Sequence, residues 1–244
     1  MKGLVLLSLL LLLGSRDQVI VNVPTADAEA QYIWRNVQDI PFFEQNGYQV
    51  AFPPVESLES LKEKARSRSL SDKDYEALTA ELKSAVYSEG DYDAGFEKVE
   101  EALPLVDVML DKIKRLDLNW NFKIHTQYNV NLTLYGPGGS YDPETGHITL
   151  FTTPQGQFKQ YANPANTIIH EIVHMGIEAS LINKYEVPHS MKERIVDQFV
   201  MLNFKALLPD YRLQDMGDYR ADEIMKSAKD LKDLDKRIEK ILNE

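Results

Sequence analysis

The chain of 244 residues contains no cysteine. It therefore has no disulfide, no thiolate metal ligand and no thiol that could carry a lipid. No apolar run is long enough to cross a bilayer core of ~30 Å as a helix, because the longest, residues 4–13, would span about half of it. Histidine is scarce as well, with five in the whole chain. A metal site in this chain must be built from a few histidines and carboxylates.

Basic residues are outnumbered: 27 lysines and arginines stand against 38 aspartates and glutamates, so the formal net charge is −11. The basic residues form no long run. Nucleic acid and anionic membrane surfaces are therefore not expected as partners. An acidic chain remains compatible with a peptide or protein substrate, and the composition leaves the oligomeric state open.

The N-terminus is typical of a signal peptide over residues 1–15. Lys2 supplies a positive start, the apolar run follows, and Gly14-Ser15 offers small residues for cleavage. A second small-residue site allows cleavage as late as residue 28. We expect export to the periplasm or the medium, with no stable membrane anchor after cleavage; the alternative is an uncleaved N-terminal anchor.

The remaining residues, 28–244, predict one α+β domain, mostly helical, with a small sheet. Its parts are a helical N-terminal part, 28–117, and a core, 120–208. Apolar periodicity predicts helices over 28–45 (ended by Pro41), 55–68, 72–88, 92–117 (with a kink or break at Pro104), 188–208 and 220–243. Alternating residues predict strands over 129–135 and 147–152, with 136–139 as a loop and 142–146 as a turn.

The next predicted helix is opened by Asn163-Pro164 and carries His170-Glu171-Ile172-Val173-His174. Histidines four residues apart lie on one side of a helix, where both can reach one zinc ion. The surrounding residues are strongly apolar, and unpartnered polar groups are costly to bury. A metal site is therefore favoured over a chance occurrence of this pattern.

Glu193 follows His174 after 18 residues, and Asp197 lies one turn beyond it. This combination resembles the thermolysin-like zinc metallopeptidases, the gluzincins. The resemblance implies a zincin-like fold and a Zn²⁺ cofactor held by His170, His174 and Glu193. It also implies that Glu171 is the general base for zinc-activated water and that Asp197 orients His170.

Other readings of these residues stay open. Ser190 and Glu193 have the spacing of a capping box, which would turn Glu193 away from a metal, unless the helix begins at Pro188. His189 is a rival third ligand. Glu178 is two turns from His170 and poorly placed to share its ion.

The expected function is that of an exported zinc peptidase in which Glu171 accepts the water proton and later delivers it to the leaving amine. Candidates for stabilising the oxyanion are His189, Tyr211 and Tyr219. The resemblance assigns residues 147–152 to an edge strand that pairs with an extended substrate, although an ordinary hairpin is equally compatible. The alternatives are a zinc hydrolase of another bond and a binding or structural protein with a zinc-stabilised helix pair.

Overall fold

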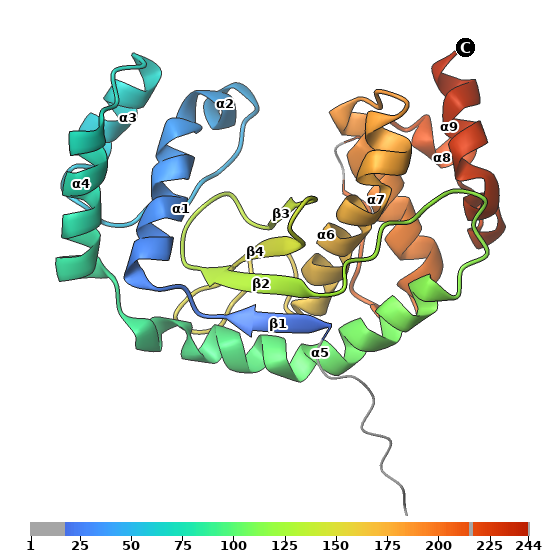
Figure 1. Cartoon of the computed structure of the whole chain (residues 1–244), viewed down its shortest axis with the longest axis horizontal. Helices are drawn as coiled ribbons and strands as arrows, with labels where there is room; N and C mark the ends of the chain where they lie inside the picture. The colour runs from blue at the N-terminus through green and yellow to red at the C-terminus, as the bar shows by residue number, and fades with distance from the viewer. Residues whose placement is uncertain (1–17, 215–216, 244) are drawn as a thin grey trace, which may run out of the picture.

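A mixed four-stranded sheet lies at the centre of the computed structural model, which describes residues 18–214 and 217–243 (Figure 1). The predicted signal peptide, 1–15, lies outside the described residues. The strands are β1 (Val19–Asn22), β2 (Tyr128–Thr133), β3 (Ser140–Asp142) and β4 (His147–Phe151). Their order is β1-β2-β4-β3, in which β1, β2 and β4 are parallel and β3 is antiparallel to β4.

The helices follow the predicted periodicity in most places. The first half contains α1 (Ala26–Gln38), α2 (Ile40–Gln45), α3 (Leu58–Arg66), α4 (Asp72–Glu81), the short turns η1 (Leu82–Val86) and η2 (Glu89–Tyr92), and α5 (Asp93–Lys114). The second half contains α6 (Ala165–Ile177), η3 (Glu178–Asn183), α7 (His189–Phe204), α8 (Ala221–Ile224), η4 (Ala228–Asp233) and α9 (Leu234–Leu242). The prediction of a mostly helical α+β domain with a small sheet is thus confirmed.

One face of the sheet is buried, as the alternation predicts. Val130 and Leu132 of β2 and Ile148 and Leu150 of β4 lie in the main core with residues of α5 and α6. Successive residues of a strand point to opposite sides, so the other face carries mostly polar side chains, with Ile20 and Phe151 as apolar exceptions. The helix with the two histidines therefore packs on the buried face of the sheet.

The helices form two groups on either side of the sheet (Figure 1). Helices α1, α3 and α4 and the turn η1 share a second, smaller core. Helices α6, α7, α8 and α9 contribute to the main core, and α5 runs beneath the sheet and bows along it. The predicted N-terminal part, 28–117, is therefore divided, because α5 belongs with the sheet.

Two strands differ from the prediction. Strand β1 precedes residue 28 yet pairs with β2, so the sheet uses residues before the expected start of the domain. Strand β3 was not predicted: it lies between the predicted loop 136–139 and the predicted turn 142–146, sharing only Asp142 with the turn, and it pairs with β4 on the side away from β2. The assignment of 147–152 to an edge strand is therefore wrong: β4 is internal and β3 is the edge.

Several helix ends also differ. Helix α1 stops at Gln38, and Pro41 lies in the first turn of α2, where its missing N–H costs nothing. Helix α5 continues through the exposed Pro104, so a break there was wrong. The single last helix is replaced by α8, η4 and α9. No helix in the described residues is long and apolar enough to cross a membrane.

Candidate metal centre

Helix α6 is held in the interior along its whole length. The Asn163 side chain accepts a hydrogen bond from the backbone N–H of Ala165 at 2.9 Å, as expected for a residue that caps a helix. Every residue from Ala165 to Ile177 is buried. His170, Glu171 and His174 are thus fixed by the packing of their apolar neighbours rather than held on a mobile surface.

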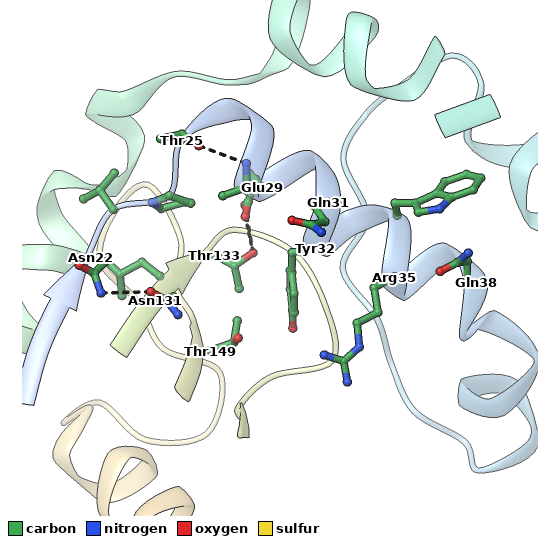
Figure 2. Close-up of a pocket in the computed structure, with 15 residues that line it drawn as sticks. Asn22, Thr25, Glu29, Gln31, Tyr32, Arg35, Gln38, Asn131, Thr133 and Thr149 are labelled. Atoms are coloured by element: carbon green, nitrogen blue, oxygen red, sulfur yellow. Dashed lines mark hydrogen bonds between the residues drawn. The ribbon is translucent and has the colours of Figure 1, made fainter. Parts of the chain in front are cut away.

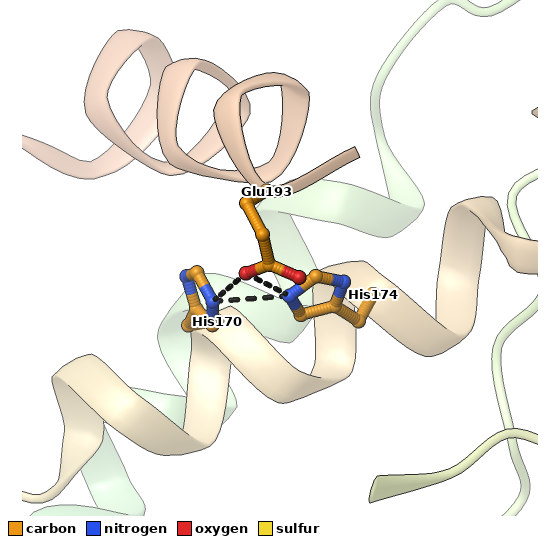
Figure 3. A group of neighbouring side chains, drawn as sticks. All are labelled: His170, His174 and Glu193. Atoms are coloured by element: carbon orange, nitrogen blue, oxygen red, sulfur yellow. Dashed lines mark hydrogen bonds and ion pairs between the residues drawn. The ribbon is translucent and has the colours of Figure 1, made fainter. Parts of the chain in front are cut away.

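Helix α7 directs Glu193 at both histidines (Figure 3). Pro188 precedes the first helical residue, His189, and no side chain caps this end. The capping box between Ser190 and Glu193 does not form. The Glu193 carboxylate is therefore available as a ligand.

The three side chains have the spacing that one zinc ion requires. His170 Nε2 lies 3.1 Å from His174 Nε2, and Glu193 Oε2 lies 3.3 Å from His174 Nε2 and 3.7 Å from His170 Nε2. Ligand atoms bound tetrahedrally at ~2.0–2.1 Å would stand about 3.3 Å apart. One oxygen and two nitrogens at these separations fit the donor set of a catalytic zinc site.

Burial and mutual contact control the charges of these groups. Burial lowers the pKa of His174 to about 4, which leaves its imidazole neutral and able to bind a metal. Burial alone would raise the pKa of Glu193, but the neighbouring His170 and His174 imidazoles lower it on balance. For His170, burial lowers the pKa, whereas Glu193, Glu171 and Asp197 together raise it on balance. Burial raises the pKa of Glu171 to about 7.

A buried chain of hydrogen bonds holds the far side of the His170 ring. Tyr211 Oη lies 2.7 Å from His170 Nδ1 and donates to Asp197 Oδ1 at 2.8 Å, while Asp197 Oδ1 itself is 3.4 Å from His170 Nδ1. Because the tyrosine proton goes to Asp197, the tyrosine oxygen can accept from His170 Nδ1–H. This arrangement leaves the lone pair on Nε2, which faces Glu193.

The same contacts decide between the candidates for an oxyanion stabiliser. Tyr211 is fully buried against Asp197 on the Nδ1 side of His170, so it does not suit that role. Tyr219 is exposed, stands over the Arg194 guanidinium and does not line the cleft at the metal cluster. His189 does line this cleft; its Nδ1 is 3.6 Å from Glu193 Oε1, and it does not belong to the three-residue cluster.

Sequence reasoning missed Tyr141, which lies in β3. Its ring stacks on His174 at 4.9 Å between centroids, and its hydroxyl donates to Glu178 Oε2 at 2.8 Å. Lys192 Nζ donates to the same hydroxyl at 3.0 Å. Glu178 is therefore engaged away from the metal cluster, as its spacing from His170 predicts. Only the unexpected strand β3 brings Tyr141 to the site.

Gly139, just before β3, lies against the catalytic candidate. A Cβ atom at this position would stand 2.5 Å from Glu171 Oε1 and 2.8 Å from the methyl group of Thr167. A side chain there would displace the Glu171 carboxylate. The sequence signal for this contact is the glycine pair Gly138-Gly139, which sequence reasoning treated only as a loop.

The cluster opens into a cleft of about 440 Å³, the size range of small-ligand sites. Its walls come from both helix groups and from the edge of the sheet. It is lined by residues 47–49, 137–141 and 159–160, by His170, Glu171, His174, His189, Lys192 and Glu193, and by Gln214. A substrate can therefore reach the side of the cluster where Glu171 lies.

A larger groove of about 670 Å³ lies elsewhere, between α1 and the polar face of the sheet (Figure 2). Its carboxylate, Glu29, accepts hydrogen bonds from Tyr92, Thr133 and the Leu134 N–H. No metal-ligating group of residues gathers there within the described residues. The smaller cleft, which holds the His-His-Glu cluster, is the better candidate for chemistry.

Comparison of the chain with protein-family models, with curated proteins and with solved structures finds no match in any of the three. The function must therefore be inferred from the cleft itself.

Proposed function

We propose that the protein is a zinc-dependent hydrolase, most specifically a peptidase. His170, His174 and Glu193 would hold the metal, and Glu171 would be the general base. The observation that carries this proposal is the convergence of three ligand atoms within 4.8 Å of one another, beside a buried carboxylate in an open cleft. This combination is typical of catalytic zinc sites, which leave one position open. In structural zinc sites, protein ligands close all four positions.

The protein groups around the cluster have separable tasks. A bound zinc ion would supply Lewis acidity towards a substrate carbonyl and a water molecule. Glu171 would accept a proton from the attacking water and deliver it to the leaving amine. Its carboxylate lies close to the backbone of Gly139, where a side chain would collide with it. His189, which lines the cleft, is the remaining candidate for binding the developing oxyanion.

Strand β3 is the best candidate for binding a peptide backbone. It is the edge of the sheet, and residues 139–141 line the cleft. An edge strand presents unpaired N–H and C=O groups to which an extended peptide can add. We therefore transfer to β3 the role that sequence reasoning gave to residues 147–152. Peptides and proteins are the proposed substrates, and export of the protein stays a prediction.

Hydrolysis should depend on zinc. Protein loaded with one equivalent of zinc should cleave members of a defined peptide mixture, and chelation should abolish cleavage until zinc is restored. Mass spectrometry of the products measures the result and locates the bonds that are cut. If a preparation shown to bind zinc cleaves no peptide, the peptidase proposal is wrong and a structural zinc site becomes the better interpretation.

A further inference from the structure

Lys159 lies in the wall of the cleft that holds the metal cluster. Its Nζ donates to the backbone oxygen of Gln49 at 2.6 Å and to that of Pro137. An ammonium group has three N–H donors, and the described residues provide no acceptor for the third. One donor of a fixed cation is therefore left for a molecule in the cleft.

The charge of Lys159 is not balanced by a carboxylate among the described residues. The other lysine of the cleft, Lys192, lies 3.9 Å from Glu178 Oε2, whereas no described acidic group comes within ion-pair distance of Lys159. Lys159 is exposed to solvent at the cleft, and partial desolvation of its ammonium group lowers its pKa. Among the described residues of the cleft, it is the cation without a carboxylate partner, so an anionic ligand can pair with it there.

Lys159 is not needed to hold its two neighbouring loops together. Ala51 and Gly136 already join these loops through two backbone hydrogen bonds, at 3.0 and 2.7 Å. These two loops are therefore joined without the lysine, and its ammonium group, which is exposed at the cleft, can also bind a ligand.

The position of Lys159 relative to Glu171 limits what it can bind. Pro137 bonds to Lys159, and Gly139 lies against the Glu171 carboxylate. These two residues are two positions apart in the chain, a span of at most about 7 Å. With the two contacts added at its ends, this span puts Lys159 Nζ at most about 14 Å from the Glu171 carboxylate, so a group held by Lys159 lies within about four residues of the bond to be cut along an extended peptide.

We propose that Lys159 anchors a carboxylate of the substrate, so that the cleft selects peptides with a negative charge within about four residues of the scissile bond. This inference rests on the proposed peptidase function. The carboxylate can come from an Asp or Glu side chain or from the C-terminus of the peptide. The second source would make the enzyme remove short C-terminal fragments.

Binding to an inactive protein tests this without turnover. The zinc-loaded Glu171→Gln variant is titrated with three kinds of fluorescent peptide, and binding is followed by anisotropy. The first is neutral and C-terminally amidated, the second has Glu for Gln at one of the four positions nearest the cut bond, and the third has a free C-terminus. The titrations are repeated in the same background with Lys159→Gln, which keeps a hydrogen-bond donor, with Lys159→Arg, which keeps the charge, and with Lys192→Gln as the matched control.

We expect at least one carboxylate peptide to bind ~10–100-fold more tightly than the neutral peptide, as for a hydrogen bond to a charged group. The preference should disappear in Lys159→Gln and remain in Lys192→Gln and Lys159→Arg. Preference for the second peptide identifies a side chain, and preference for the third identifies the C-terminus. Equal binding of all three peptides, binding of none, or a preference that survives Lys159→Gln would overturn the inference. Absence of hydrolysis in the parent protein would instead count against the peptidase proposal, while the binding preference would still decide the role of Lys159.

Discussion

Glu171→Gln should abolish hydrolysis while the protein keeps its zinc and its fold. Glutamine preserves the size of the side chain, but it cannot take a proton from water. Removal of a general base typically lowers the rate by ~10²–10⁴-fold, and the loss should be at least that large because the same group returns the proton to the amine. Zinc should remain, since Glu171 does not belong to the three-residue cluster.

The measurement is kcat/KM together with zinc content and melting temperature for the same preparation. Glu144→Gln, on an exposed turn, is the matched control and should leave all three unchanged. A structural zinc protein would have no turnover to lose. Full activity in Glu171→Gln would remove the proposed mechanism whatever metal the protein held.

Glu193→Ala should weaken zinc binding more than any change at His189. Loss of a group that merely orients a ligand typically costs 10–100-fold in metal affinity, so loss of a ligand itself should cost more than ~100-fold. His189 contacts Glu193 Oε1 at 3.6 Å and is not part of the cluster, so His189→Ala should change the affinity little. Competition with a chromophoric chelator measures both affinities.

The reverse order of affinities would mean that His189 is the third ligand. It would also mean that the gluzincin resemblance is accidental, because Glu193 carries that resemblance. Retention of tight zinc binding by both single variants would show that neither residue completes the site.

The parts of the site that lie close together in sequence could be predicted. His170 and His174 are separated by one helical turn, and the apolar residues around them indicate a helix that is buried on nearly all sides. The prediction that Glu193 binds the same metal as His170 and His174 rested on the resemblance, in which a ligand on a second helix follows the histidines at this spacing. The structure places these three residues together, with Asp197 beside His170 as the resemblance implies.

The parts of the site that depend on tertiary packing could not be predicted. Strand β3 has three residues, too few for an alternating pattern, and it forms because β4 offers a partner. Tyr141 was therefore missed although it stacks on His174. Tyr211 was a candidate for stabilising the oxyanion, but its contacts with His170 Nδ1 and Asp197 could not be predicted, because spacing in the chain does not tell which side of the His170 ring a side chain approaches. Lys159 escaped notice because an isolated lysine has no pattern.

The central claim is that His170, His174 and Glu193 hold one zinc ion and leave a position open to the cleft. Anomalous diffraction at the zinc absorption edge, from crystals of protein loaded with zinc, tests it most directly. We expect one peak per chain, within ~2.0–2.2 Å of His170 Nε2, His174 Nε2 and Glu193 Oε2, with its fourth side towards the cleft. Absence of a peak at these atoms, or a peak closed off by a fourth protein ligand, would contradict the claim.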